Sequence, residues 1–384
     1  MKKHVLIVAP SLDLATNVSG VSAVTNFIIA HNRECEYEHF LQGRSDGESG
    51  ALNRVVRIWK NYRKWVNVNV NVNVNVNVNY IIHYNYPLDT PSIVRDYFFM
   101  RAARRKGIPM VIHIHGGLYL FKERKPFFIK WILDRVFSWD NPFIVLSEKE
   151  REEIQRQYGT ENVTVLPNCV EIPSFNGNMN GNVNVNDNVN ENVNVNVNGN
   201  VNGNENGIHV LYLGRIEPNK GMDYLFEAMR MLKEKGHGVT LHFAGVEQGK
   251  NGYIGRFQEL LGDHFVYEGV VSGGKKTELL RRCQIFVLPS LYEGLPISLL
   301  ETMAYGMVPV VTDVGSIGEY VKDGVNGLMI GVRDAVSIVN ALERLIKDKK
   351  LMREMSTAAR QTIVTRLRPT KYVERLNEIY AQTL

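Results

Sequence analysis

The chain has few cysteines and no long apolar run. Its three cysteines, Cys35, Cys169 and Cys283, are widely separated and show no metal-binding spacing. We therefore expect free thiols in a cytosolic protein. No stretch approaches the roughly 18 consecutive apolar residues of a membrane span. The apolar run in Met1–Pro10 is too short for a signal peptide and is better explained as a first buried strand. These absences predict a cytoplasmic location.

The chain also lacks an Asp-X-Asp metal motif, and its charge is nearly balanced. It has 45 lysines and arginines against 40 aspartates and glutamates. Residues 1–172 carry 22 basic and 17 acidic groups, and the remainder carries 23 of each. The whole basic excess therefore lies in the N-terminal half.

Basic residues of the N-terminal half form three clusters interleaved with aromatic residues. Such a face suits an anionic membrane surface, so we predict peripheral contact with the inner face of the cell membrane. The alternative is ordinary solvated helix faces with the aromatic residues turned to the core. Nucleic acid is not expected as a partner, because no reading motif accompanies the charge. The residues concerned are Arg54, Arg57, Lys60, Arg63 and Lys64; Arg101, Arg104, Arg105 and Lys106; Lys122, Arg124, Lys125 and Lys130; and Trp59, Trp65, Phe121, Phe127, Phe128 and Trp131.

Apolar strand-like runs alternate with longer amphipathic segments in two series. At 384 residues the chain suits two domains of roughly 150–200 residues each. Strands separated by helical patterns indicate a parallel, doubly wound sheet in each domain, so the predicted fold class is α/β with two Rossmann-like domains facing a cleft. The predicted strands are His4–Ala9, Tyr80–Tyr84, Met110–Ile114, Pro142–Leu146 and Val163–Leu166, then His209–Leu213, Thr240–Ala244, Phe265–Tyr267, Ile285–Leu288 and Val308–Thr312.

The predicted domains are residues 1–172 and 208–365, joined by a linker at 173–207 and followed by a terminal segment at 366–384. This last segment is helical in pattern. Its apolar stripe consists of Tyr372, Val373, Leu376, Ile379 and Tyr380.

Two low-complexity tracts interrupt the pattern. Val66–Asn79 is a run of Val-Asn dipeptides, and from Asn176 to Asn206 every even-numbered residue is Asn. Alternation would place Val on one face of a strand, but Asn disfavours strands. We expect a flexible linker for the second tract and a surface loop for the tip of the first, both without a catalytic role. The alternative is a β-forming adhesive tract.

The stretch from Ile285 to Val311 is the most informative part of the chain. It reads as a buried strand, a loop, a helix beginning near Ile297 and a second buried strand, which is a βαβ unit. Open α/β sheets bind ligands at the carboxyl ends of such strands, and a helix N-terminus favours phosphate. Yet Glu293 lies in the loop and Glu301 in the predicted first turn, so both carboxylates need hydrogen-bond donors such as sugar hydroxyls. A nucleotide-sugar supplies phosphate and hydroxyls together.

Glu293 and Glu301, which have seven residues between them, closely resemble the paired-glutamate motif of the retaining glycosyltransferase family four (glycosyl transferases group 1), which has the GT-B fold. Other matches follow in order along nearly the whole chain outside the two tracts. Leu213–Gly221 resembles the basic donor-phosphate motif, Pro167–Glu171 the Pro-Asn-Gly segment before the linker, Ile112–Gly117 the strand end with the active-site histidine, and Val18–Ser22 the N-terminal glycine loop. Gly20 alone remains in that loop, where many members have two glycines.

The resemblance implies an acceptor-binding first domain, a donor-binding second domain and a terminal helix that crosses back to the first. It also implies catalytic roles for His115, Arg215, Lys220 and Glu293. His113, on the same strand face, is the alternative to His115, and either histidine is otherwise a core residue. The implied donor-binding set is Gly20, Gly214, Arg215, Lys220, Leu295, Pro296, Ile297, Ser298, Leu299 and Glu301.

The chemistry of these residues fits departure of a nucleoside diphosphate. Arg215 and Lys220 would stabilise the negative charge that grows on the phosphate nearest the sugar. With these cations and a helix N-terminus available, neither a metal nor another cofactor is expected. Glu301 would accept hydrogen bonds from ribose hydroxyls and Glu293 from the donor sugar. The alternatives are a helix-capping role for Glu293 and a glycosidase carboxylate pair.

The sequence therefore predicts a retaining, metal-independent glycosyltransferase that uses a UDP- or GDP-sugar. Its acceptor would be a glycan or lipid-linked molecule of surface polysaccharide or glycolipid synthesis. The alternatives are a non-catalytic nucleotide-sugar-binding protein and a nucleotide-sugar epimerase on the same fold.

Overall fold

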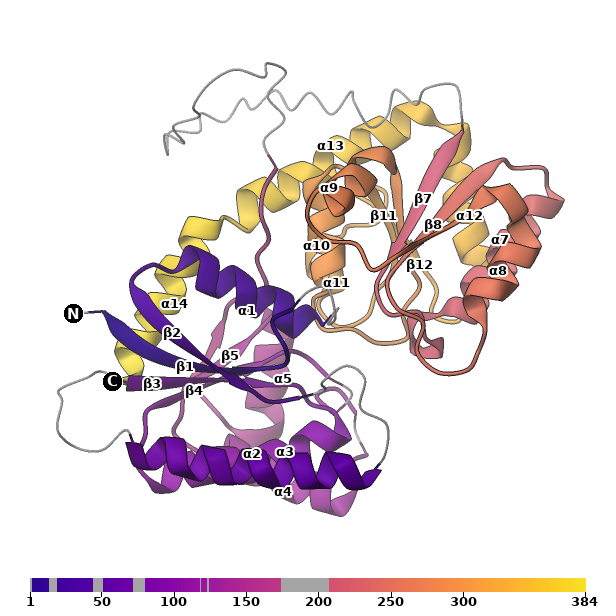
Figure 1. The fold of residues 1–384 in the computed structure, drawn as a ribbon. Helices are drawn as coiled ribbons and strands as arrows, with labels where there is room; N and C mark the ends of the chain where they lie inside the picture. The colour runs from indigo at the N-terminus through magenta and orange to yellow at the C-terminus, as the bar shows by residue number, and fades with distance from the viewer. Residues whose placement is uncertain are drawn as a thin grey trace.

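Two parallel six-stranded sheets form the protein, which is described here by a computed structural model (Figure 1). The structure describes residues 2–13, 19–43, 51–71, 80–117, 119–122, 124–173 and 207–384. The strand orders are β2-β1-β3-β4-β5-β6 and β12-β11-β10-β7-β8-β9. Helices lie between successive strands, as parallel connections require. The predicted fold class of two doubly wound sheets is confirmed.

The first sheet comes from the N-terminal half of the chain. Its strands are β1 (Lys3–Ala9), β2 (Cys35–Leu41), β3 (Tyr80–Tyr86), β4 (Met110–Ile114), β5 (Phe143–Val145) and β6 (Val163–Val165). Its helices are α1 (Gly20–His31), α2 (Ala51–Asn71), α3 (Thr90–Arg105), α4 (Phe127–Phe137) and α5 (Glu148–Tyr158).

The second sheet comes from the C-terminal half. Its strands are β7 (Ile208–Leu213), β8 (Val239–Ala244), β9 (Phe265–Gly269), β10 (Ile285–Leu288), β11 (Val308–Thr312) and β12 (Leu328–Ile330). The helices are α7 (Met222–Glu234), α8 (Tyr253–Leu261), α9 (Gly273–Arg282), α10 (Ile297–Ala304), α11 (Ile317–Tyr320), α12 (Ala335–Lys347), α13 (Lys349–Arg366) and α14 (Pro369–Thr383), with short 3₁₀ turns at Pro218–Lys220 and Gly262–His264.

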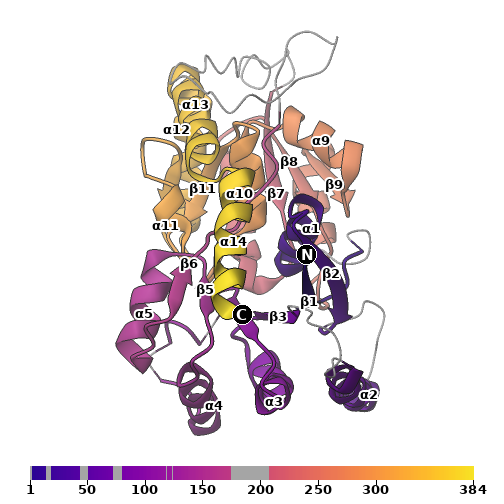
Figure 2. The same cartoon turned by 90° about the vertical axis from the view of Figure 1, so that its left-hand side faces the viewer.

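The two faces of the first sheet pack differently. Side chains such as Ile82 and Tyr84 of β3 pack with Trp65 of α2 and Phe99 of α3 in one core cluster. The opposite face packs against α1 and α14, on the side of the second sheet. Helices α2, α3 and α4 lie on the far side from the second sheet in both views (Figures 1 and 2). The face toward the second sheet is therefore the one that positions a site between the domains.

The terminal helix α14 lies against the first domain, although α13 belongs to the second (Figure 2). Asn377 accepts a hydrogen bond from Asn32 Nδ2 at its Oδ1, at 2.8 Å. The Tyr380 hydroxyl lies 2.7 Å from Nδ1 of His83 on β3. These buried polar contacts tie the last helix of the chain to the first sheet.

The first Val-Asn tract begins within a helix, because Val66–Asn71 continues α2. The tip of the tract, predicted to be a surface loop, lies outside the described residues. The helix is anchored just before the tract, because Trp65 is fully buried and donates to the carbonyl of Phe99 at 2.9 Å. Val and Asn are poor helix formers but do not break a helix. Residues 72–79 and the second tract, 176–206, lie outside the described residues.

All three cysteines are free and buried. Among the helices of the described residues, none is long and apolar enough to cross a bilayer.

Candidate active site

The loop after β7 brings the predicted basic motif to the end of β10. Gly221 has φ +76°, and a Cβ there would lie 2.0 Å from the carbonyl oxygen of Pro289. Only glycine allows this close approach with a left-handed conformation. Arg215 forms an ion pair with Glu217, with 3.3 Å between Nη2 and Oε1. The loop therefore places Lys220 directly beside the segment that carries Glu293.

Lys220 and Glu293 form an ion pair at the centre of the second domain's half of the site. Lys220 Nζ lies 2.7 Å from Glu293 Oε1, and the two side chains are only 14% and 12% exposed. Ser290 donates a second hydrogen bond to the same oxygen, also at 2.7 Å. A phosphate would compete for the ammonium and a sugar hydroxyl for the carboxylate.

Glu301 is held by a lysine that the sequence did not single out. Lys276 Nζ, from α9, lies 2.6 Å from Glu301 Oε1. Helix α10 begins at Ile297, so Glu301 is its fifth residue and lies beyond the first turn. The prediction that it lies in the first turn was wrong by a small margin. Its carboxylate consequently projects toward α9.

The N-terminus of α10 contributes through its backbone. Pro296 precedes the helix and provides no side-chain cap. Leu295, Ile297 and Leu299 turn their side chains into the core, whereas Ser298 is partly exposed. Ile297 and Leu299 can therefore contribute to donor binding only through their backbone amides, which a helix leaves unpaired in its first turn.

The first domain contributes a histidine held by an asparagine. His115 follows β4 directly, and its Nε2 lies within hydrogen-bonding distance of Asn85 Oδ1 on β3. Burial lowers the pKa of His115 to about 3, with a smaller contribution from nearby His83. His113 is fully buried, and its Nδ1 lies 3.1 Å from Nε2 of His83. His115 is therefore the member of the pair that reaches the interdomain side.

The two halves meet at glycines. A Cβ on Gly116, which has φ +67°, would lie 2.7 Å from the Cα of Gly294. A Cβ on Gly20, the first residue of α1, would lie 4.0 Å from Ile297 Cγ1. The predicted histidine loop and glycine loop of one domain thus abut the predicted glutamate motif of the other.

Two further polar contacts bridge the domains. Asn168 Nδ2 donates to the Leu295 carbonyl at 2.7 Å, which gives the Pro-Asn segment a direct contact with the glutamate motif. Ser316 Oγ, beside α11, lies 3.4 Å from Oε1 of the fully buried Glu150. Burial raises the pKa of Glu150 to about 7, against the lowering effect of the bond from Leu146 N.

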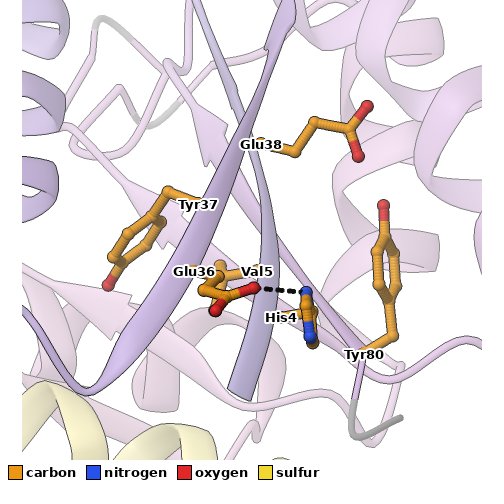
Figure 3. Close-up of a pocket in the computed structure, with 6 residues that line it drawn as sticks. All are labelled: His4, Val5, Glu36, Tyr37, Glu38 and Tyr80. Atoms are coloured by element: carbon orange, nitrogen blue, oxygen red, sulfur yellow. Dashed lines mark ion pairs between the residues drawn. The ribbon is translucent and has the colours of Figure 1, made fainter. Parts of the chain in front are cut away.

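A separate pocket of about 170 Å³ lies at the opposite edge of the first sheet (Figure 3). It is formed at the amino ends of β1, β2 and β3, away from the carboxyl ends that carry the site. Its lining residues are His4, Val5, Glu36, Tyr37, Glu38 and Tyr80.

Asn85, Glu150, Lys276 and Ser290 are the site residues that sequence reasoning missed. Ser290 and Lys276 lie close to the recognised motifs, and Ser147-X-X-Glu150 has the spacing of a capping box. Asn85 has no such signal, because its role depends on pairing between β3 and β4.

Two segments of the chain match families of glycosyltransferases. Residues 81–172 match the family described as Glycosyltransferase Family 4, and residues 198–362 match the one described as Glycosyl transferases group 1. These segments contain the two halves of the site just described, except for Gly20.

Individual relatives agree with these matches. The chain is 25% identical over 295 residues (73% of this chain, 70% of the relative) to the UDP-Gal:alpha-D-GlcNAc-diphosphoundecaprenol alpha-1,3-galactosyltransferase of Escherichia coli. It is 32% identical over 152 residues to the N,N'-diacetylbacillosaminyl-diphospho-undecaprenol alpha-1,3-N-acetylgalactosaminyltransferase of Campylobacter jejuni, a match spanning 40% of this chain and 39% of that protein.

The structure of sucrose-phosphate synthase from Thermosynechococcus elongatus superimposes with a TM-score of 0.72 at 16% identity, covering 99% of both chains, which is a likeness of fold. The two family matches show that the chain belongs to the glycosyltransferases of the group 1 and family 4 type, and the paired sheets with this likeness of fold show the GT-B architecture.

Proposed function

We propose that the protein transfers a sugar from a UDP- or GDP-sugar to a glycan or lipid-linked acceptor, with retention of configuration and without a metal or other cofactor. The observation that carries this proposal is the ion pair of Lys220 and Glu293 beside the interdomain contact of Gly116 and Gly294. A cation and a carboxylate at one point match a donor that presents a phosphate next to sugar hydroxyls. A hydrolase or a simple phosphate site would not need both.

The positive groups of the second domain suit the leaving group. During transfer the bond between the sugar's anomeric carbon and the phosphate oxygen breaks, and negative charge grows on that oxygen. Lys220, Arg215 and the first amides of α10 would stabilise this charge more in the transition state than in the ground state. Glu293, released from Lys220, would accept a hydrogen bond from the sugar, and Glu301 from the ribose.

The neutral character of His115 favours retention by front-face attack. Because burial lowers the pKa of this histidine to about 3, it is a weak base at neutral pH. In front-face attack the acceptor hydroxyl bonds to the anomeric carbon, and its proton passes to the departing phosphate oxygen. The products are a glycoside and a nucleoside diphosphate, and no protein base is consumed.

An exposed aromatic surface supports a lipid-linked acceptor at the inner face of the membrane. Phe127, Phe128 and Trp131 of α4 are 85%, 51% and 49% exposed. We call these three residues the α4 aromatic surface. Helix α4 begins after the His115 loop, so its first turn lies at the same edge of the sheet as the site. Both relatives named above carry a diphospho-undecaprenol group in the name of their substrate. Aromatic and basic side chains together suit an anionic lipid interface.

The experiment that tests this function is product analysis by NMR. A thermal-shift screen across uridine, guanosine and adenosine diphosphate-sugars selects the donor. The anomeric coupling constant of the product is then measured with and without EDTA. We expect the donor's configuration to be kept and the activity to survive the chelator. An inverted product, or activity that depends wholly on added divalent metal, would overturn the mechanism.

A further inference from the structure

Asn85 is fixed in one orientation by its neighbours. It lies near the end of β3 and is only 5% exposed. Its Nδ2 donates to the carbonyl oxygen of Val8 at 2.9 Å and lies 3.4 Å from Thr25 Oγ1. A backbone carbonyl can only accept, so the amide nitrogen must face Val8. The amide oxygen therefore faces His115.

This orientation determines where His115 carries its proton. The Oδ1 of Asn85 is an acceptor, so the Nε2 of His115 must be the N–H that donates to it. The depressed pKa of His115 keeps the ring neutral at neutral pH, so it carries a single proton. The lone pair is then on Nδ1, which makes this atom a hydrogen-bond acceptor.

Two more histidines, His113 and His83, support the ring of His115 on its buried side. The ring centroid of His113 lies 4.1 Å from that of His115. His113 Nδ1 lies 3.1 Å from His83 Nε2, and His83 Nδ1 lies 2.7 Å from the Tyr380 hydroxyl. Both supporting histidines are fully buried. The ring of His115 is thus bonded on one edge and packed on one face, while it remains partly exposed itself.

The backbone of His115 lies against the donor loop. A Cβ on Gly294 would be 3.1 Å from the His115 carbonyl oxygen, and Glu293 is the residue before Gly294. Nδ1 of the histidine and the carboxylate of Glu293 are both acceptors, so neither suits a phosphate, and both suit hydroxyls. We infer that Asn85 is a positioning residue that holds His115 as the Nε2–H tautomer, so that Nδ1 accepts a hydrogen bond from a hydroxyl of the donor sugar. This inference rests on the proposed function.

The tautomer can be measured without any activity assay. Nitrogen-15 NMR of the full-length protein with labelled histidine distinguishes a protonated ring nitrogen from a bare one, and loss of a signal in His115→Gln assigns the residue. We expect a bare Nδ1 and a protonated Nε2 in the wild type at neutral pH. We also expect a mixture of tautomers in Asn85→Ala. A protonated Nδ1 in the wild type, or an unchanged tautomer in a folded Asn85→Ala, would overturn the inference.

A matched pair at His115 tests the contact with the sugar and requires no change in the buried sheet. The side-chain amide of asparagine reaches the position of Nδ1 and retains an acceptor there. That of glutamine reaches the position of Nε2 and retains only the donor to Asn85. We expect His115→Asn to keep about ten-fold more kcat/KM for the donor than His115→Gln, although it loses the hydrogen bond to buried Asn85 and should unfold at a lower temperature. Equal losses would refute the role of Nδ1.

The two measurements separate failure of the inference from failure of the proposed function. A wild-type protein that neither transfers nor hydrolyses any nucleotide-sugar would refute the function, while the NMR spectra still decide whether Asn85 sets the tautomer.

Discussion

The two halves of the site differ in how they treat charge. The second domain holds its charged groups in close ion pairs, Lys220 with Glu293 and Lys276 with Glu301. The first domain presents a neutral network in which His115 is bonded to Asn85. Burial lowers the pKa of each of the three clustered histidines.

This difference indicates a division of labour. Charge that develops on a leaving phosphate is best stabilised by fixed cations, which only the second half supplies at the described contacts. Neutral donors and acceptors of fixed tautomer are suited to recognising hydroxyls, because they select geometry without attracting a phosphate. The second half would then determine the rate and the first half the orientation of the sugar.

Replacing Lys220 should have the largest effect on turnover, because it removes a fixed cation from the second half of the site. We expect Lys220→Ala to lower kcat about 10²–10³-fold, equivalent to roughly 3–4 kcal/mol by analogy with loss of an oxyanion-hole donor, and Arg215→Ala to act in the same direction. The matched control is Lys235→Ala, whose lysine also pairs with a glutamate, Glu343, at 2.8 Å but outside the site. Steady-state kinetics with unfolding curves provide the measurement. Near-normal turnover in both site variants would refute the phosphate site.

Glu150 is a buried carboxylate that the first half places against the other domain. Its raised pKa, about 7 against 4.5, means that the folded protein holds this proton more tightly than the unfolded chain. Glu150 therefore lowers the free energy of unfolding progressively as pH rises from about 4.5 to about 7, and the cost stays constant above that. Since one pKa unit is about 1.4 kcal/mol, the full cost is about 3 kcal/mol.

Glu150→Gln should remove this cost while keeping an acceptor for Leu146 N. We expect the variant to be as stable as the wild type near pH 4.5 and more stable by a few kcal/mol at pH 8. Denaturant titrations of both proteins at the two pH values measure this difference. The buried histidines, whose pKa values are lowered, make the fold more stable as pH rises, but both proteins contain them, so their effect cancels. A difference in the free energy of unfolding that does not change with pH would show that folding does not raise the pKa of Glu150.

The Lys276–Glu301 pair should matter for binding and less for rate. If Glu301 contacts the ribose in both the ground and the transition state, Glu301→Gln raises KM for the donor about ten-fold and leaves kcat nearly unchanged. The same variant should not alter the product's configuration. A loss confined to kcat would place Glu301 among the groups that act only in the transition state and would contradict its assignment to the ribose.

The α4 aromatic surface should contribute a smaller, additive amount to membrane association. We expect Phe127→Ser to weaken binding to anionic vesicles about five-fold or more, because an aromatic side chain leaves the interface. Val336→Ser on α12 of the second domain, where Val336 is 52% exposed and no basic and aromatic cluster is predicted, is the control. Binding of the wild type should also fall at high ionic strength. Vesicle binding that is indifferent to lipid charge, or an equal loss in the control, would count against this surface.

Much of the fold could be predicted because parallel strands are buried on both faces and read as continuous apolar runs. The observed strands match the predicted ones to within a residue or two. Two strands, β2 and β12, were not predicted, and each is one of the two edge strands of its sheet. β2 (Cys35–Leu41) leaves several residues at least partly exposed, so it lacks an apolar run.

The candidate site could be located where its motifs are local and not where contacts join distant segments. The local pattern predicted Glu293 in a loop before α10, and the resemblance to a family motif pointed to Leu213–Gly221. The contacts of Asn85 with His115, and of Glu150 with Ser316, join residues 30 and 166 positions apart. No local pattern encodes such pairs, because they depend on strand order and on the approach of two domains.

Shortening the Asn176–Asn206 tract should have the smallest effect on activity and stability, although this tract connects the two halves of the site. The described residues at its ends are held elsewhere: Asn168 binds the Leu295 carbonyl, and the Pro173 carbonyl accepts from Arg360 Nη2 at 2.7 Å. Removing five of its dipeptides should change the loop-closure free energy by only about 0.3 kcal/mol, because this cost varies with the logarithm of length. We therefore expect unchanged kcat, KM and unfolding midpoint in the deletion variant. Removing Asn168 as a contact, in Asn168→Ala, should instead weaken the approach of the domains and raise KM. A tract deletion that lowers activity as much as Asn168→Ala would mean that the tract itself helps to position the two halves.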